Sequence, residues 1–304
     1  MTEGQHKQQG PKYTKHAKHN DFLMPFGFLE ENFSTRLTYQ PTEADAFVST
    51  YPKCGTTWTQ HIIYTILNHG VPLQADQRMN VYFPHLEEVG CDYVQKLPKT
   101  NGHFRLIKTH LPYDMTPMSS SAKYIYVTRN PKDCVVSFYF HTKGFINCYD
   151  YGDGTLDEYF ELFFDGKVDF GDYFVNLKSW LRHRNDENVL FITYEDLVTD
   201  YRGGVLNIAS FLGGRFKDML LENNESMLQK VMEGCSFNHM QKDLLRWCSK
   251  REDKFTPFIR NGKVKDWENH LSKYQIKRLD QKLEKELGVD AIASLWPVFE
   301  LQCD

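Results

Sequence analysis

The chain lacks several features that would assign it to a class of protein at once. Its seven cysteines are irregularly spaced and include no C-x-x-C pair, so the sequence indicates neither a disulfide framework nor a zinc site. No segment approaches the roughly 18 apolar residues of a membrane span. The formal net charge is -4, which disfavours a nucleic-acid partner because phosphate backbones bind to basic surfaces. We therefore expect a cytoplasmic protein with reduced thiols and with neither membrane nor nucleic acid as a partner.

What the chain does contain is the composition of an ordinary globular protein. Of its 304 residues, 41% are hydrophobic and 25% are charged, which is ample for a core. Residues 1–20 are polar and include no apolar stretch, so we expect a flexible tail there rather than a signal peptide. No repeat or long low-complexity linker follows. We expect a single domain over residues 21–304.

Short apolar runs alternate with helical patterns along this domain. A helix is expected from Thr56 to His69 with Gly70 as its C-terminal cap, because apolar residues recur there at helical spacing. The Asn-Pro pair at 130–131 is an N-cap followed by proline at the first helical position, and another helix is expected after 194–196. This alternation predicts an α/β fold, with a central parallel sheet and helices on both faces. The expected strands are residues 46–50, 104–108, 124–128 and 189–193.

The first expected strand leads into a loop that suits a phosphate group. Residues 51–58 read Tyr-Pro-Lys-Cys-Gly-Thr-Thr-Trp, and they join the strand to a helix start, where free N–H groups and a positive dipole end meet an anion. Two threonine hydroxyls and Lys53 add donors and a positive charge. The loop is P-loop-like but is not a Walker A sequence, because its lysine precedes its single glycine. For this segment alone, a capped helix with an incidental lysine is the alternative.

Further polar residues follow the other expected strands, at the sheet edge where ligands bind in such folds. His110 comes two residues after Lys108, where an imidazole can take a proton from an acceptor hydroxyl. Arg129 ends the third strand and can hold a phosphate bidentately, and Ser137 lies in the next helix. Late in the chain, residues 258–262 place another arginine beside a glycine. For each of these residues taken alone, a structural role without any ligand is the alternative.

Together these residues resemble the cytosolic sulfotransferase family, from about Phe22 to the end of the chain. The stretch Y-P-K-x-G-T-T-W is highly specific for that family. The other matches are Lys108-Thr109-His110-Leu111-Pro112, the segment from Arg129-Asn130-Pro131-Lys132-Asp133 to Ser137, Tyr194-Glu195-Asp196-Leu197, and Arg260-x-Gly262 with Asp266-Trp267.

The resemblance implies 3′-phosphoadenylyl sulfate (PAPS) as the sulfuryl donor, its desulfated form PAP as the product, and no metal. It implies His110 as the general base, Lys53 as the cation that neutralises the leaving phosphate, and Lys108 and Ser137 as further catalytic residues. Trp58 would stack on the adenine. The donor-binding residues that it implies are Lys53, Cys54, Gly55, Thr56, Thr57, Trp58, Arg129, Ser137, Tyr194, Cys235, Ser236, Phe237, Met240, Phe258, Arg260, Asn261 and Gly262.

The expected acceptor is a small molecule, and the expected pocket walls are aromatic. That character suits a phenol, a catecholamine, an arylamine or a sterol, although core packing explains each aromatic residue at least as well. The expected acceptor-binding residues are Phe26, Phe83, Lys108, His110, Phe140 and His141, with Phe28, His85 and Phe145 as further wall residues.

The chain departs from the family pattern at several positions. Asn261 stands where the family usually has lysine, Lys265 replaces a glycine, and Cys235 replaces a threonine. The family's dimer motif, K-x-x-x-T-V-x-x-x-E, falls on residues 268–277, and none of its defining positions matches. We therefore expect a monomer, or a dimer formed through another surface.

Three other functions compete with this interpretation. A P-loop-type kinase requires a lysine after the glycines and an acid that binds magnesium, and the loop does not supply that lysine. A non-catalytic nucleotide-binding protein would keep the phosphate loop but would need no base at His110. A membrane-anchored carbohydrate sulfotransferase would need an N-terminal anchor, which the polar residues 1–20 do not provide.

Overall fold

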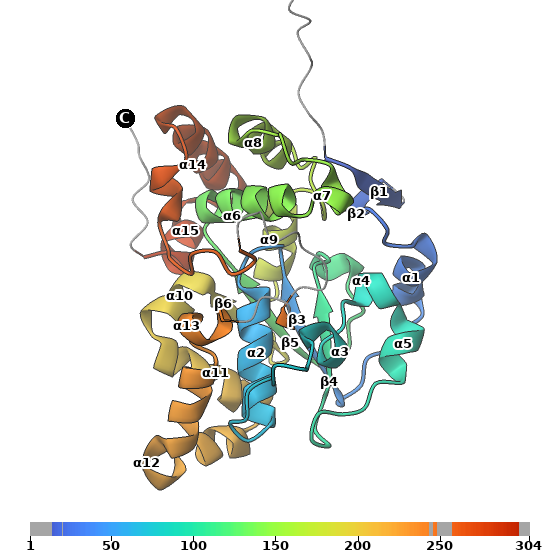
Figure 1. The fold of residues 1–304 in the computed structure, drawn as a ribbon, viewed down its shortest axis with the longest axis vertical. Helices are drawn as coiled ribbons and strands as arrows, with labels where there is room; N and C mark the ends of the chain where they lie inside the picture. Colours follow the sequence, from blue (N-terminus) through green and yellow to red (C-terminus); the bar gives the residue numbers. More distant parts are fainter. Residues whose placement is uncertain (1–13, 20, 243–245, 248–256, 298–304) are drawn as a thin grey trace, which may run out of the picture.

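A four-stranded parallel sheet lies at the centre of the computed structural model (Figure 1), which describes residues 14–19, 21–242, 246–247 and 257–297. The strand order is β4-β3-β5-β6. The predicted α/β fold with a parallel sheet is confirmed, and each predicted strand agrees with the observed one to within a residue at either end. The bounds are β3 Asp45–Thr50, β4 Arg105–Thr109, β5 Lys123–Thr128 and β6 Val189–Thr193.

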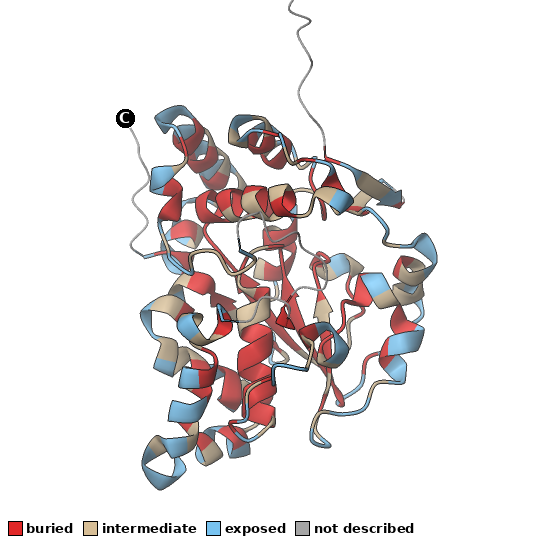
Figure 2. Ribbon diagram, in the orientation of Figure 1, coloured by how far each residue is buried: buried red, intermediate tan, exposed pale blue. Residues whose placement is uncertain are grey.

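Successive residues of the sheet point to two separate cores, because side chains alternate between the faces of a strand. Phe47, Tyr124 and Tyr126 belong to one core, whereas Val48 and Ile125 belong to the other. Both faces of the sheet are therefore covered (Figure 2). Helices α6, α8, α9, α14 and α15 contribute to the first core, and α2, α11 and α12 contribute to the second.

The helices and short elements outside the sheet complete the chain as follows. They are β1 His16–His19, β2 Phe22–Pro25, α1 Glu30–Ser34, η1 Thr35–Leu37, α2 Thr56–Leu67, α3 Met79–Tyr82, α4 Leu86–Val89, α5 Cys91–Gln95, η2 Tyr113–Met115, α6 Pro131–Gly144, α7 Ile146–Tyr149, α8 Leu156–Phe164, α9 Tyr173–Leu181, α10 Tyr194–Thr199, α11 Tyr201–Leu212, α12 Gly214–Gly234, α13 Phe237–Met240, η4 Asp266–Asn269, α14 Lys273–Leu287 and α15 Val289–Leu295. Within the described ranges, no helix is long and apolar enough to cross a bilayer.

The ends of the predicted helices follow local chemistry. The side chain of Asn130 accepts a hydrogen bond from the Lys132 N–H at 2.9 Å, so the predicted N-cap of α6 is confirmed. Helix α2 ends two residues before His69, which is already left-handed with a φ of 52°. Gly70 then closes this end, with its N–H 2.8 Å from the Thr65 carbonyl. Helix α10 begins at Tyr194 itself, earlier than expected, because Thr193 is its N-cap.

Part of the segment expected to be a flexible tail forms a strand. His16–His19 (β1) pairs antiparallel with β2, which begins at Phe22. Two histidines anchor this hairpin: His16 Nδ1 lies 2.6 Å from the buried Asp169 carboxylate, and His19 Nε2 lies 2.8 Å from the Phe28 carbonyl. The flexible tail was predicted from the low hydrophobicity of the segment, which carries no information about specific polar contacts such as these. Residues 1–13 and 20 lie outside the described part of the chain.

Candidate active site

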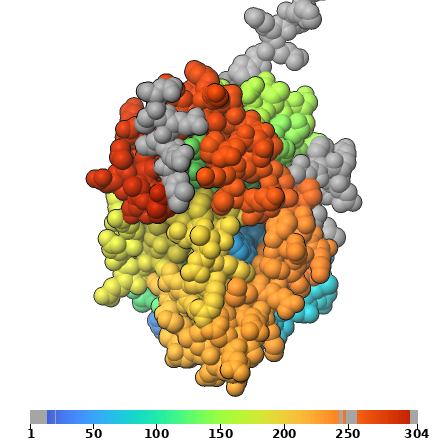
Figure 3. All heavy atoms as spheres, turned by 90° about the vertical axis from the view of Figure 1, so that its left-hand side faces the viewer, coloured from blue at the N-terminus to red at the C-terminus, as the bar shows by residue number. Residues whose placement is uncertain are grey.

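A cavity of about 540 Å³ lies at the carboxyl ends of the central strands. The residues that follow the strands line it: Lys53 after β3, His110 after β4, Arg129 after β5 and Tyr194 after β6. This is the edge at which parallel sheets bind ligands. On one side of the molecule, blue atoms from the early part of the chain lie in a hollow between yellow and orange segments (Figure 3).

The loop between β3 and α2 is shaped by two left-handed residues. Lys53 has a φ of 69° and Gly55 a φ of 103°. A Cβ atom on Gly55 would lie 2.8 Å from Cδ2 of Tyr194, so both the backbone and the neighbouring ring require glycine here. No side chain caps α2, which begins at Thr56. The N–H groups of its first turn therefore remain suited to an anionic ligand, together with the positive end of the helix dipole.

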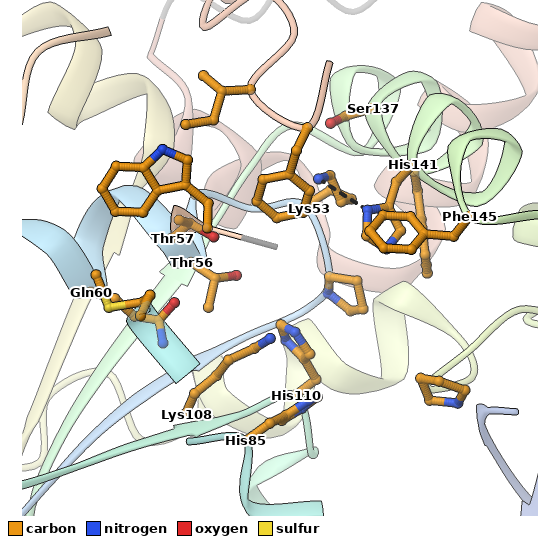
Figure 4. Close-up of a pocket in the computed structure, with 18 of the residues that line it drawn as sticks. Lys53, Thr56, Thr57, Gln60, His85, Lys108, His110, Ser137, His141 and Phe145 are labelled. Atoms are coloured by element: carbon orange, nitrogen blue, oxygen red, sulfur yellow. Dashed lines mark hydrogen bonds between the residues drawn. The ribbon is translucent and has the colours of Figure 1, made fainter. Parts of the chain in front are cut away.

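Lys53 extends into the cavity beside α6. Its Nζ atom lies 3.5 Å from Nδ1 of His141 and 4.5 Å from the centre of the Phe258 ring. Figure 4 shows the Lys53 side chain extending from the loop between β3 and α2 toward His141, with Ser137 on the neighbouring turn of α6. The predicted loop lysine is thus brought close to residues that come from two distant segments.

The hydrogen bonds of His110 decide which of its nitrogens carries the proton. Nδ1 lies 2.8 Å from the Thr50 carbonyl, which can only accept, so Nδ1 carries hydrogen and Nε2 keeps its lone pair. The side chain of Asn176 donates to the His110 carbonyl at 3.0 Å. Burial, and then the Lys108 ammonium, hold the pKa of His110 well below its usual value of 6.5. At neutral pH His110 is an unprotonated base at the cavity wall.

Glu87 fixes the backbone at this base, and sequence analysis missed it. One of its oxygens, Oε1, accepts hydrogen bonds from the Thr109 hydroxyl and the His110 N–H, each at 2.8 Å. The other oxygen faces the ring of His85 at 3.3 Å. Glu87 is the first of two adjacent glutamates, and nothing in the sequence connected it with His110.

Arg129 lies on the cavity wall beside the loop that carries Lys53. Its Nη2 donates to the Lys263 carbonyl at 2.9 Å, its Nη1 lies 3.5 Å from the Lys53 carbonyl, and its guanidinium lies 4.4 Å from the centre of the Tyr194 ring. Only 7% of the residue is exposed. A largely enclosed guanidinium on the wall of a cavity suits a charged oxygen ligand.

The segment 258–262 closes the cavity near α6. Arg260 is ion-paired with Asp266 and lies 4.6 Å from the centre of the Phe140 ring. Asn261 donates to the same carboxylate at 2.7 Å. Gly262 has a φ of 67°, and a Cβ atom there would meet the Phe237 ring at 2.4 Å. This turn therefore also requires glycine.

Most of the residues predicted for the site line one cavity. The predicted residues on its wall are Phe26, Phe28, Lys53, Gly55, Thr56, Thr57, Trp58, Phe83, His85, Lys108, His110, Arg129, Ser137, Phe140, His141, Phe145, Tyr194, Phe258, Arg260, Asn261 and Gly262.

Five predicted donor-site residues are not on the wall. Cys54 points into the core, where its thiol lies 3.8 Å from that of Cys134. The Cys235 thiol contacts Thr65, and the Cys235 carbonyl accepts a hydrogen bond from the Trp58 indole at 2.9 Å. The other three residues that are not on the wall follow Cys235 in the sequence: Ser236 is the N-cap of α13, and Phe237 and Met240 are its first and last residues.

Most of the other wall residues come from segments that carry no motif. We found no periodic or chemical signal for those segments, because tertiary packing places them. They include Met79, Asn80, Glu88, Phe170, Arg246 and Trp247, and Gln60 of the predicted helix α2 joins them on the wall. Within the described ranges, no cluster of three or more histidine, cysteine or acidic side chains could hold a metal ion.

Comparison with known proteins agrees with this arrangement. The model of the family described as "Sulfotransferase domain" matches residues 43–289. Sulfotransferase 1C2 of Oryctolagus cuniculus is 30% identical over 275 residues, which cover 85% of this chain and 88% of that protein. The amine sulfotransferase of the same species is 32% identical, with 85% of each chain covered.

Solved structures show the same fold. A mouse sulfotransferase complexed with PAP superimposes with a TM-score of 0.72 at 25% identity, covering 92% of this chain and 96% of that one. Retinol dehydratase, in complex with androsterone and the inactive cofactor PAP, gives a TM-score of 0.75 at 20% identity over 91% of this chain and 90% of its own. At that identity the second likeness concerns the fold alone.

Proposed function

Because this chain belongs to the sulfotransferase family and is a PAPS-dependent sulfotransferase, we propose that it sulfates a hydroxyl or amine of a small aromatic acceptor, with His110 as the general base. The observation that carries this proposal is the state of His110. Its Nδ1 is committed to the Thr50 carbonyl, and its pKa is held low by burial, so the unprotonated Nε2 is left for the acceptor.

The donor end of the cavity fits a nucleotide with two phosphate groups. The uncapped start of α2 and Lys53 suit the phosphate next to the sulfuryl group, and the Arg129 guanidinium on the cavity wall suits a second phosphate. Ser137, Arg260 and Gly262 would complete the second site. Trp58, whose ring lies 5.7 Å from that of Tyr194, would stack on the adenine. The PAP bound to the mouse relative supports this donor.

The transfer step follows from these positions. The acceptor oxygen or nitrogen forms a bond to sulfur while the bond between sulfur and the phosphate oxygen breaks. His110 Nε2 takes the proton of the attacking group, and the electron pair of the broken bond stays on the phosphate. Lys53 and the N–H groups of α2 then stabilise the growing negative charge. Lys108 adds positive charge next to His110, as its contribution to the lowered His110 pKa shows.

The wall of the cavity away from the loop at residues 51–58 is aromatic and includes Phe26 and Phe83, while Phe140 stands beside Arg260. It suits a phenol, a catecholamine, an arylamine or a sterol, and the name of the rabbit amine sulfotransferase supports nitrogen acceptors as well. We propose that the enzyme acts in the cytoplasm without a metal. We also propose that it is a monomer, or a dimer whose interface avoids residues 268–277.

The test combines donor binding with transfer of labelled sulfate. PAP at 100 times its Kd should stabilise the folded protein by about 2.7 kcal/mol and raise its melting temperature far more than ATP with magnesium does. Labelled PAPS should then pass its label to at least one acceptor in a panel of phenols, arylamines and sterols. Equal or greater stabilisation by ATP with magnesium contradicts the donor assignment. Stabilisation by PAP without any transfer would identify a non-catalytic binding protein.

A further inference from the structure

A second imidazole stands beside the base. His85 lines the cavity, and its ring centre is 4.9 Å from that of His110, with an angle of 83° between the planes. Figure 4 shows both rings next to Lys108, on the wall opposite Ser137. His85 is placed there by a β-bridge to Lys108 at the edge of the sheet. Two histidines therefore face the region where the acceptor reacts.

Glu87 determines which His85 nitrogen faces the cavity. The enclosed Nε2 of His85 lies 3.3 Å from Oε2 of Glu87, a close contact without hydrogen-bond alignment, and neither atom has a hydrogen-bond partner among the residues that the structure describes. Burial raises the pKa of Glu87, but His85 and the His110 N–H outweigh it and hold the pKa below its usual range. A carboxylate only accepts, so the hydrogen of His85 belongs on Nε2. Nδ1 is then the nitrogen that keeps a lone pair toward the cavity.

The surroundings of His85 fix its ring without satisfying Nδ1. Its ring packs edge-on against Phe28 at 5.1 Å and lies 5.7 Å from Phe170, and neither side chain offers a hydrogen-bond donor. Burial, and then Lys108, lower the pKa of His85, so the ring is neutral at neutral pH. A bound molecule that displaces water from Nδ1 of His85 without donating a hydrogen bond to it therefore loses binding free energy.

We propose that His85 is a specificity-determining residue, which accepts a hydrogen bond from a group next to the reacting hydroxyl and so favours acceptors with two adjacent hydroxyls. Catechols have this arrangement, because neighbouring hydroxyls on one ring point to the same side. One hydroxyl faces His110 Nε2 and loses its proton, and the other donates to His85 Nδ1. This inference rests on the proposed function and narrows the substrate class of the same site.

The experiment compares catechol with resorcinol, using labelled PAPS and the full chain. Both acceptors have two hydroxyls on one ring, but those of resorcinol are one carbon further apart, so resorcinol is the matched control. We expect kcat/KM to be about 10-fold or more higher for catechol, the usual cost of leaving a buried polar group unpaired. Phenol, which lacks the second hydroxyl, should resemble resorcinol.

Two variants then test the residue itself. His85→Phe should bring the two acceptors to within about 3-fold of each other, chiefly by losing activity on catechol, while His85→Gln should restore part of the preference through its amide oxygen. PAP binding and melting temperature report whether each variant is folded. Similar kcat/KM values for catechol and resorcinol in the unaltered enzyme overturn the inference, whatever the variants do. Transfer to no acceptor at all overturns the proposed function instead.

Discussion

Replacing Gly55 with alanine perturbs the phosphate loop in two ways that can be separated. The φ of 103° lies in the region that side-chain-bearing residues avoid, and the added Cβ would lie 2.8 Å from Cδ2 of Tyr194. Tyr194 is itself only 7% exposed and carries the Arg129 guanidinium on its ring at 4.4 Å. The ring therefore cannot move without shifting a residue of the proposed donor site.

Each effect has a typical size. A left-handed backbone costs an L-residue about 1–2 kcal/mol, and overpacking a well-filled region costs about 1–3 kcal/mol. We therefore expect Gly55→Ala to lower the free energy of unfolding by about 2–5 kcal/mol. PAP affinity should fall as well, because displacement of the Tyr194 ring moves Arg129.

Urea unfolding monitored by fluorescence measures the first quantity, and titration with PAP measures the second. Gly102→Ala is the matched control, because Gly102 has a φ of 75° but nothing within 4 Å of an added Cβ. It should show the backbone cost of about 1–2 kcal/mol and unchanged PAP affinity. Gly55→Ala in a Tyr194→Ala background should recover the overpacking part, because alanine lacks the Cγ, Cδ2 and Cε2 atoms that the added Cβ would approach. Equal losses of stability in the two alanine variants would refute the reasoning about the ring.

The remaining predictions concern the chemistry. His110→Ala should lower turnover by about 10²–10⁴ while PAP affinity stays unchanged; a folded variant with near-normal turnover in the labelled-sulfate assay would show that His110 is not the base. Lys53→Ala should weaken PAP affinity and turnover together, since its charge faces both the bound phosphate and the transition state, and a loss of only one of them contradicts that role. Burial and Lys108 lower the His110 pKa, so His110 stays unprotonated as pH falls through 6.5, and kcat/KM should decline only below that value. A pH profile in which kcat/KM falls to half at or above pH 6.5 would contradict a lowered His110 pKa.

Much of the fold was predictable because each strand of the sheet contains a short apolar stretch. Burial on both faces of a parallel sheet favours such stretches, and β3, from Asp45 to Thr50, is buried at every residue although only residues 46–48 are apolar. The strand ends then locate Lys53, His110 and Arg129 at one edge by topology alone. Those residues needed no knowledge of distant contacts.

The acceptor wall could not be predicted in the same way. His85 reaches the site through a single β-bridge to Lys108, and Phe170 reaches it through a turn that bonds to Leu23 of the N-terminal hairpin. Both placements depend on pairs of segments that are far apart in the sequence. Residues 16–19 illustrate the same limit, since His16 finds its partner Asp169 only in the folded chain. Local pattern carries no information about such pairs.

Because Arg260 is already ion-paired with Asp266, the phosphate that we propose to bind there would have to exchange with a carboxylate. Asp266 also accepts from Asn261 and lies 3.3 Å from Nε2 of His270, so it is a tethered competitor at high effective concentration. A phosphate gains only the difference between its own attraction to Arg260 and that of the carboxylate. A sugar hydroxyl in the same place carries no charge with which to displace Asp266. Such a built-in competitor reduces the affinity that a phosphate gains at this position, whereas a nucleotide without that phosphate leaves the ion pair intact and gains nothing from Arg260.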